Sequence, residues 1–422
     1  MPRHYGKLSA MMFLQFGVYG LWLPIAGRFL TASAEEGGLG FSEGQSGAIV
    51  GIAAAIGAIA SPFIVQLADR RFQAQRFLGV LMFIGGFLKL IVYPQSNYYI
   101  WLLLSVAFTL MFMPSAAICN AMPMRHLDDP TRQFPSVRMW TAIAWVLVGW
   151  TFSFVMLKEN VQPSWLPPFF KGDDVPMAGA AMRTSVLWSG VLAMGFGVWA
   201  FFFLPKSPPV REAREKTALA KALGMLKIRS FAVLLGISLL VSAVHAIYFM
   251  QCAKFLSRAG LDDAYIMPAM SIGQFCEMLM YLVLGKFLPK LGFKKTIAIG
   301  MIAFVIRFLI FGTTGFPVWV MVAAQALHGI CYPFFFAACF IYADKVAPPD
   351  IRNSAQSVYN FIFYGLGPMT AVLLNGWLAS RYAPAGETLM LDGFQNFWYM
   401  LAGLTTVALL AFLILFREER KE

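Results

Sequence analysis

The chain has 422 residues, of which 59% are hydrophobic and only 13% charged, with a formal net charge of +12. Soluble domains are nearer roughly 45–50% apolar and 25% charged, so this composition excludes an ordinary soluble protein and indicates one that uses lipid as its solvent. The positive charge lies in short connections between apolar runs, where membrane topology explains it better than nucleic acid, so we expect no nucleic-acid partner.

A membrane-crossing helix needs about 20 mostly apolar residues. The first such run follows Arg3 and Lys7 and is too long for the core of a signal peptide, so it is expected to be a retained helix. The sequence therefore predicts an all-α membrane protein with twelve transmembrane helices, near residues 8–30, 44–67, 76–93, 98–122, 134–157, 183–204, 231–256, 264–287, 295–313, 317–342, 353–379 and 395–416.

Charges in the loops predict how the helices are oriented. Lys and Arg concentrate in alternate loops and at both ends of the chain, whereas the loops between them are acidic or neutral. Because basic loops stay on the cytoplasmic side, both termini are predicted to be cytoplasmic. The acidic loops contain Glu35, Glu36 and Glu43, then Asp173 and Asp174, then Asp262 and Asp263, then Glu387 and Asp392.

A long basic connection divides the apolar runs six and six. We predict an N-terminal six-helix bundle (1–205), a cytoplasmic linker (206–229) and a C-terminal six-helix bundle (230–422). Charged turns after the second and eighth runs suggest that the halves are duplicated. Transporters built from such repeats bind substrate between the halves, near the middle of the bilayer.

Short motifs in both halves carry a family resemblance. The turn Asp69-Arg70-Arg71 is similar to a degraded form of the charged motif of the major facilitator superfamily. Within that superfamily the chain resembles the bacterial nucleoside:proton symporters, through segments spread over its whole length: Phe13 to Leu23, Met113-Pro114 with Asn120, Phe134 to Trp140, Gln274 with Glu277, Arg307-Phe308, and Ile351 to Gln356.

That resemblance implies a secondary active transporter of the bacterial inner membrane. It would import nucleosides with protons by alternating access, and we expect it to act as a monomer. A proton-coupled sugar or glycoside symporter on the same scaffold is the alternative, because a polar cavity suits any polyol.

Glu277 is an acidic residue in the middle of an apolar run. Such a group is costly in lipid, which favours a functional role, although a hydrogen bond between helices would also account for it. Gln274 lies three residues earlier on the same helical face. We interpret the pair as a binding site for substrate hydroxyls, with Glu277 also a candidate for proton coupling.

Arg138 and Trp145 lie seven residues apart on the fifth run and face the same way. An arginine here could extend its charged end toward the interface, but the resemblance implies a substrate-binding arginine, and the fold would allow it to pair with Glu277. Trp145 falls where the family has an aromatic residue near the substrate. Gln15 and Asn120 are further candidates for the cavity lining, or for bonds between helices.

His245 and Tyr248 lie three residues apart on the seventh run. A histidine inside a helix is often a packing residue, but its near-neutral titration makes His245 a second candidate proton carrier. The family has an amide pair here. It also has Phe-Asp at the positions of Tyr332 and Pro333, so the absence of that acid leaves proton coupling to Glu277 or His245. Tyr332 is a candidate for stacking on a nucleobase.

Other polar groups receive simpler interpretations. Asp69 and Arg70 look like cytoplasmic gate charges, and Lys89 is expected to extend toward a membrane surface. Arg307 is deeper and has no assigned role. The five cysteines lie in apolar runs as packing residues. Metal-ligand spacings and nucleotide-binding motifs are absent from the sequence, so we expect no metal, no cofactor and no enzymatic activity.

Overall fold

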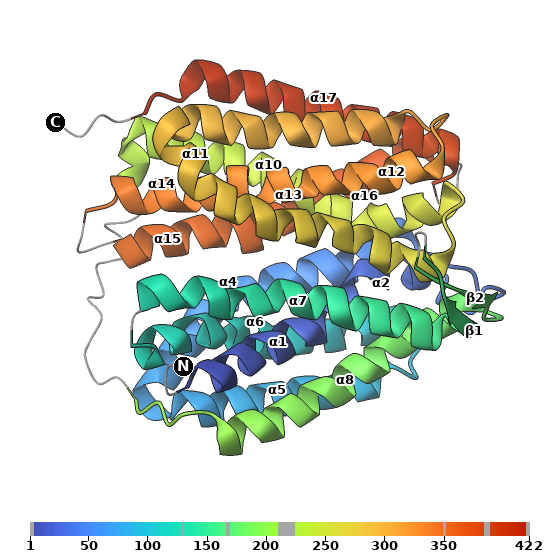
Figure 1. Ribbon diagram of the computed structural model, residues 1–422, viewed down its shortest axis with the longest axis horizontal. Coiled ribbons are helices and arrows are strands. Elements are labelled where there is room, and N and C mark those ends of the chain that lie inside the picture. Colours follow the sequence, from blue (N-terminus) through green and yellow to red (C-terminus); the bar gives the residue numbers. More distant parts are fainter. Residues whose placement is uncertain are drawn as a thin grey trace. The chain divides into compact units, whose positions relative to one another are not determined.

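A computed structural model describes residues 4–128, 130–165, 169–209, 224–348, 352–383 and 389–418. Its helices are shown in Figure 1. Eleven helices in these residues are long and apolar enough to cross a membrane. One of them, α11 (Asp263–Gly312), runs for 50 residues and contains Gly292 in a non-helical conformation, with φ 73° and ψ 170°. Segments 263–291 and 293–312 are each long enough to cross a bilayer, which accounts for the twelve predicted crossings.

The chain forms two compact units. The first contains residues 1–211 together with 249–257 and 261–271, and the second contains 212–248, 258–260 and 272–422. The long helices α10 and α11 therefore each contribute residues to both units. The predicted boundary at residues 206–229 stays a prediction, because residues 210–223 lie outside the described part of the chain.

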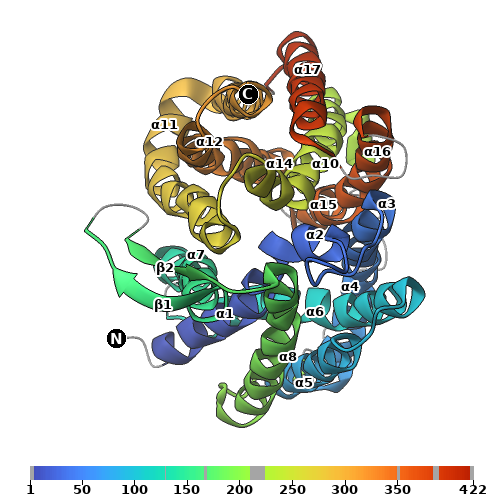
Figure 2. The same cartoon turned by 90° about the vertical axis from the view of Figure 1, so that its right-hand side faces the viewer.

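Six of the membrane-crossing segments found among the described residues belong to the first unit. A β-hairpin follows α7 (Figures 1 and 2). Its elements are α1 (Tyr5–Gly20), α2 (Leu23–Thr31), α3 (Glu43–Gly47), the π-helical η1 (Ala48–Ile52), α4 (Ala53–Arg71), α5 (Ala74–Val92), α6 (Tyr98–His126), α7 (Pro130–Met156), β1 (Lys158–Pro163), β2 (Phe170–Asp174) and α8 (Ala178–Phe203).

Most of the remaining elements lie in the second unit. They are the 3-10 turn η2 (Met225–Lys227), α10 (Arg229–Arg258), α11, α12 (Val318–Ala324), the 3-10 turn η3 (Gln325–Leu327), α13 (His328–Cys331), the π-helical η4 (Tyr332–Ala337), α14 (Ala338–Val346), α15 (Arg352–Asn360), the π-helical η5 (Phe361–Leu366), α16 (Gly367–Tyr382) and α17 (Leu391–Leu415).

Small residues allow the helices of the first unit to pack closely. Helices α5 and α8 lie against each other along Gly79, Gly86, Gly190 and Gly197. A methyl group on Gly190 would lie 2.9 Å from the carbonyl oxygen of Gly86, and one on Gly79 would lie 2.7 Å from that of Gly197. Helix association in lipid depends on such contacts, because lipid tails remove the hydrophobic driving force that operates in water.

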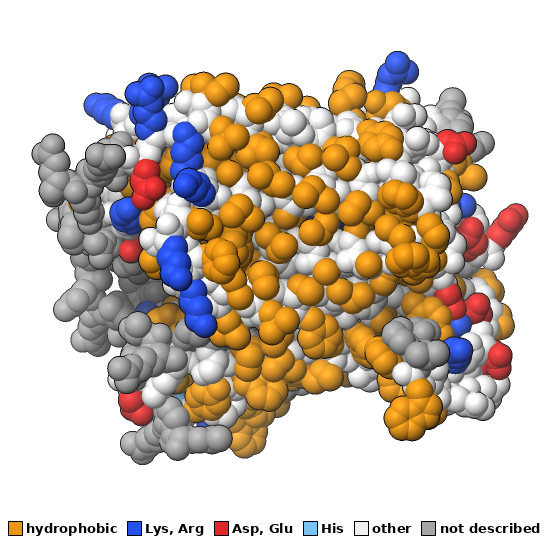
Figure 3. All heavy atoms as spheres, turned by 45° about the horizontal axis from the view of Figure 1, so that its top comes forward, with side chains coloured by type: hydrophobic (Ala, Val, Ile, Leu, Met, Phe, Trp, Pro, Cys, Tyr) orange, Lys and Arg blue, Asp and Glu red, His pale blue; other side chains and the backbone are white. Residues whose placement is uncertain are grey.

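Apolar side chains cover the outside of the helices. On α11, Phe275, Leu279 and Leu282 are exposed, the last to 74%. Figure 3 shows hydrophobic side chains spread over the face in view, with most of the visible Lys and Arg toward one end of the helices and most of the visible Asp and Glu toward the other. This distribution is typical of a surface that lies in lipid between two charged boundaries.

The hairpin β1–β2 was not expected from the sequence. Its strands pair antiparallel, with Lys158 opposite Asp174 and Pro163 opposite Phe170. The connection had been interpreted only as an acidic loop, since it lacks a clear alternation of apolar and polar residues.

Candidate functional site

In the first unit, polar residues from three helices meet. Gln15 on α1 is fully buried, and its Nε2 donates to Ser115 Oγ on α6 at 2.8 Å. One turn along α6, Arg138 Nη1 of α7 donates to Asn120 Oδ1, and the guanidinium lies 4.9 Å from the ring centre of Phe16. Three residues predicted from the sequence, Gln15, Asn120 and Arg138, therefore lie on adjacent helices.

Aromatic rings form a wall in the same unit. Tyr19 stacks on Phe112 with 4.7 Å between ring centres and meets Trp145 edge-on at 6.4 Å. Trp145 also contacts Phe249 at 6.1 Å, and Gly20 gives its ring room, since a methyl group there would lie 3.3 Å away. Tyr19 and Trp145 are only partly buried, so a flat ligand could stack on the wall.

In the second unit, His245 and Tyr248 of α10 both contact one ring on α13. The His328 ring stacks on His245 at 5.4 Å and on Tyr248 at 5.3 Å. The Tyr248 hydroxyl donates to Gln325 Oε1 at 2.6 Å. Gln325 and His328 were not selected from the sequence, although both are polar residues inside an apolar run, which is the signal used for the other candidates.

Arg307 on α11 completes this ring cluster. Its Nη1 donates to His328 Nδ1 at 2.8 Å, and its guanidinium lies 4.1 Å from the ring centre of Tyr248. Because Arg307 has no proton-accepting atom, Nδ1 of His328 must accept this bond, which leaves any ring proton on Nε2. Arg307 thus orients His328, and the residue that had no assigned role becomes part of the candidate site.

Gln274 and Glu277 of α11 are both partly buried. The Glu277 carboxylate and the Tyr281 hydroxyl lie close enough to the Tyr332 phenol to interact with it electrostatically, and Tyr332 makes a side-chain hydrogen bond with Tyr364. Tyr332 begins the π-helical segment η4, which places Pro333 in its first turn. Such π-helical insertions are frequent at functional sites.

Some sequence-based predictions stay untested. The pairing of Arg138 with Glu277 would join residues of different units. The side chains of Asp69 and Arg70, the predicted gate, lie outside the described residues. Among the described residues there is no cluster of three or more His, Cys, Asp or Glu that could hold a metal ion.

Lys89 does not extend to a membrane surface as expected. It is buried on α5, with its Nζ 3.8 Å from the ring centre of Trp22 and 4.3 Å from that of Phe108. Aromatic faces attract a cation, and this attraction is stronger away from water. The environment of this lysine is therefore determined by the helices packed against it rather than by its distance from the end of its own helix.

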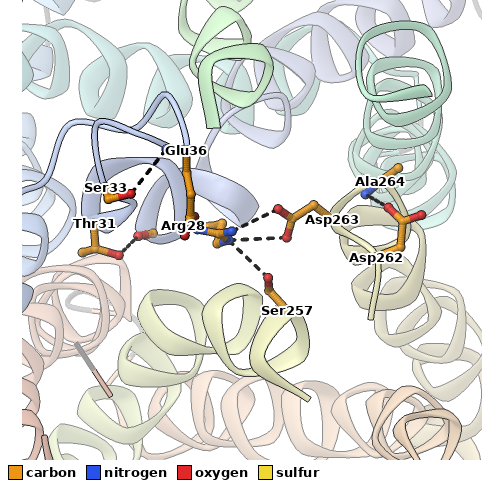
Figure 4. Close-up of polar contacts among 9 residues, drawn as sticks. Arg28, Thr31, Ser33, Glu36, Ser257, Asp262, Asp263 and Ala264 are labelled. Atoms are coloured by element: carbon orange, nitrogen blue, oxygen red, sulfur yellow. Dashed lines mark hydrogen bonds and ion pairs between the residues drawn. The ribbon is translucent and has the colours of Figure 1, made fainter. Parts of the chain in front are cut away.

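Ion pairs gather where the acidic loops meet the helices of the first unit. Arg28 on α2 donates to Glu36 at 2.7 Å, to Ser257 at 3.2 Å and to Asp263 at 3.4 Å (Figure 4). In the hairpin, Lys158 pairs with both Asp174 and Asp262. Burial opposes the charge on Lys158, but its bonds to the two carboxylates outweigh burial and raise its pKa. Four of the acidic residues that indicated topology, Glu36, Asp174, Asp262 and Asp263, are thus bonded to basic partners.

Known proteins resemble this chain over its whole length. The family described as nucleoside H+ symporters matches residues 4–421. The Escherichia coli (strain K12) protein YegT is 29% identical over 99% of this chain and 94% of its own length, and the nucleoside permease NupG of the same organism is 23% identical over 97% and 95%. The crystal structure of nucleoside transporter NupG, at 21% identity, superposes with a TM-score of 0.82 over 99% of this chain and all of that one.

Proposed function

Because this chain belongs to the nucleoside H+ symporter family, we propose that it imports nucleosides together with protons by alternating access. The observation that carries the proposal is the family match over residues 4–421, which spans both polar clusters. The fold supports it, since the chain is a multi-pass membrane protein and superposes with a nucleoside transporter along its length.

We propose that Arg138, Gln274 and Glu277 bind the nucleoside. The two hydroxyls of a ribose diol can each donate and accept hydrogen bonds, and a carboxylate, an amide and a guanidinium can supply the matching acceptors and donors. The aromatic wall around Tyr19 and Trp145 supplies flat faces for a base, and Tyr332 offers another. His245 and Tyr248 would act with them through the ring cluster on His328.

Glu277 is the preferred proton-coupling residue. Arg307 lies next to the two histidines of the ring cluster and donates to His328, and a positive neighbour disfavours a second positive charge. This arrangement makes His245 the weaker of the two candidates. The distribution of loop charges supports a cytoplasmic location for both termini. We further propose that the membrane is the bacterial inner membrane, as membership of the family implies, and that the protein acts as a monomer.

Uptake into proteoliposomes tests the function. Radiolabelled uridine or adenosine should accumulate when the outside is more acidic than the inside, and a protonophore should abolish the accumulation. Absence of gradient-driven uptake of any nucleoside would refute the proposal. Competition by free sugars, without competition by nucleosides, would instead select the sugar symporter.

A further inference from the structure

The β1–β2 hairpin exposes two aromatic side chains at its tip. Trp165, which follows β1, is 100% exposed, and Phe169, which precedes β2, is 46% exposed. The backbone nitrogen of Ser164 donates to the carbonyl oxygen of Phe169 at 2.6 Å and closes the turn. Trp165 and Phe169 are called the hairpin tip below. Because burial of aromatic surface is favourable, the tip would gain free energy by contacting an apolar partner.

The base of the hairpin is packed, in contrast to its tip. Lys158 pairs with Asp262, which directly precedes α11. The Tyr265 hydroxyl on α11 donates to the carbonyl oxygen of Phe170 at 3.0 Å, and the Phe170 ring lies 5.0 Å from the ring of Phe154 on α7, centre to centre. The strands are therefore held against α7 and the start of α11, and a loose connection does not explain why the tip is exposed.

The backbone at the tip is strained. Phe169 has a left-handed conformation, with φ 67°, which bulky residues rarely adopt. Glycine would adopt it at lower cost. Such conformations persist where the surrounding structure enforces them and are concentrated at functional positions. The presence of a phenylalanine ring at this position, despite the strain, indicates that the ring itself has a role.

Short connections keep the hairpin at the boundary of the membrane. Helix α7 ends at Met156 and β1 begins at Lys158, while β2 ends at Asp174 and α8 begins at Ala178. The headgroup region on each side of a bilayer is about 5–8 Å deep, whereas a strand as long as β1 spans about 20 Å. Figure 2, which looks at this end of the molecule, shows the hairpin extending sideways past α7. A hairpin that extends sideways can keep its tip within reach of the headgroups.

The distribution of polar and apolar side chains favours lipid as the partner. At the base of the hairpin, the exposed acids Glu159 and Asp173 lie opposite each other, whereas the tip is aromatic. Val155 near the end of α7 and Met177 just before α8 are exposed apolar residues, so the tip continues the lipid-facing surface of the first unit. Tryptophan in particular is enriched where headgroups meet hydrocarbon, because its ring is apolar and its N–H is polar.

We infer that the hairpin tip inserts into the headgroup boundary of the bilayer, in the leaflet at the acidic end of the helices, which the loop charges assign to the outside of the cell. Phospholipid is the partner of this surface. Since Lys158 and Phe170 are bonded to Asp262 and Tyr265, the inserted hairpin also holds the start of α11 at the membrane surface. The inference goes beyond nucleoside transport and does not depend on the identity of the substrate.

Spin labelling of the full-length protein in phospholipid liposomes tests the inference. The native cysteines are buried or half-buried, so a cysteine added at an exposed position can be labelled selectively, with the unmodified protein as the blank. A label at Trp165→Cys is compared with one at Glu159→Cys, on the exposed base of the same hairpin. The ratio of collisions with oxygen, which dissolves in lipid, to collisions with a polar nickel complex should be at least about tenfold higher at Trp165→Cys, because a polar solute is strongly disfavoured outside water.

Two results would overturn the inference. Equal collision ratios at the two positions would place the tip in water, and rare collisions with both reagents at Trp165→Cys would mean that protein, such as a second copy of the chain, covers it. If Trp165→Cys does not fold, Phe169→Cys provides the same comparison. Collision rates do not require transport, so failure of the liposomes to accumulate nucleosides would refute the proposed function alone.

Discussion

Gly329 on α13 lies against the backbone of α11 at Cys276 and at Glu277, the proposed proton-coupling residue. A methyl group added at this position would overlap the backbone carbon of Cys276 and would lie 2.6 Å from the backbone nitrogen of Glu277. Both neighbours are parts of a helix, which cannot move aside as the end of a flexible side chain can. The substitution Gly329→Ala therefore forces the two helices apart.

The size of the effect follows from this geometry. Ordinary contact begins at about 3.4 Å, so the backbone at Glu277 must move by about 0.8 Å. Because native protein interiors are densely packed, overpacking of this kind lowers the free energy of unfolding by about 1–3 kcal/mol. A shift of that size also displaces the carboxylate of Glu277, so we expect nucleoside binding to weaken by a factor of about 5–150, at roughly tenfold per 1.4 kcal/mol.

Gly376→Ala provides the matched control. Gly376 lies in α16 of the same unit, and an added methyl group would meet nothing within 4 Å. In a helix this change is neutral or stabilising by up to about 1 kcal/mol. Thermal unfolding in detergent, followed with and without uridine, compares the two variants. If Gly329→Ala unfolds and binds as Gly376→Ala does, the close approach of α13 to α11 does not position Glu277.

Three further predictions concern charged side chains. Glu277→Gln should weaken nucleoside binding by about 1.5–3 kcal/mol, the usual loss of a charged hydrogen bond, and abolish proton-driven accumulation; unchanged accumulation in proteoliposomes would contradict the assignment. Arg307→Lys should lower the thermal unfolding temperature, because lysine cannot both lie flat on an aromatic ring and donate to His328; an unchanged temperature would mean that the ring cluster does not need the guanidinium. The hydrogen bond from Lys158 holds the pKa of Asp174 below its usual 3.8. The ion pair between these two side chains therefore stabilises the hairpin fully above pH 3.8, and this stabilisation is lost as the pH falls through the lowered pKa of Asp174. Limited proteolysis should then find the wild-type hairpin protected at neutral and mildly acidic pH and the Lys158→Met hairpin cleaved at both. Equal cleavage of the two proteins would show that Lys158 does not hold the hairpin in place.

Hydrophobicity and charge in the sequence were sufficient to predict the membrane class and the helices. Each crossing is a local property, because about 20 apolar residues in lipid must form a helix that satisfies its own backbone hydrogen bonds. The all-α membrane fold was predictable because each of its crossings could be identified separately in this way. The crossing at 264–287 and the one at 295–313 were separated correctly even though α11 is continuous except at Gly292.

The candidate site was only partly predictable. The free energy needed to place a polar group in lipid depends only on that residue and the apolar run around it, so the sequence alone could identify Glu277, Arg138 and His245 as candidates. Which groups bond to one another depends on helices far apart in the chain. Tertiary packing alone determined that Arg307 orients His328 and that Lys89 lies on aromatic rings.

The acidic loops illustrate the same division. The charge pattern along the chain was enough to predict that Glu43 lies with the other acids at one end of the helices, because loop charge follows membrane orientation. The tertiary structure alone decided that this carboxylate is buried against Lys254 while Glu36 remains exposed. Burial depends on which backbones approach closely, here α10 on α2 at Gly27, and a one-dimensional pattern of charges carries no information on that approach.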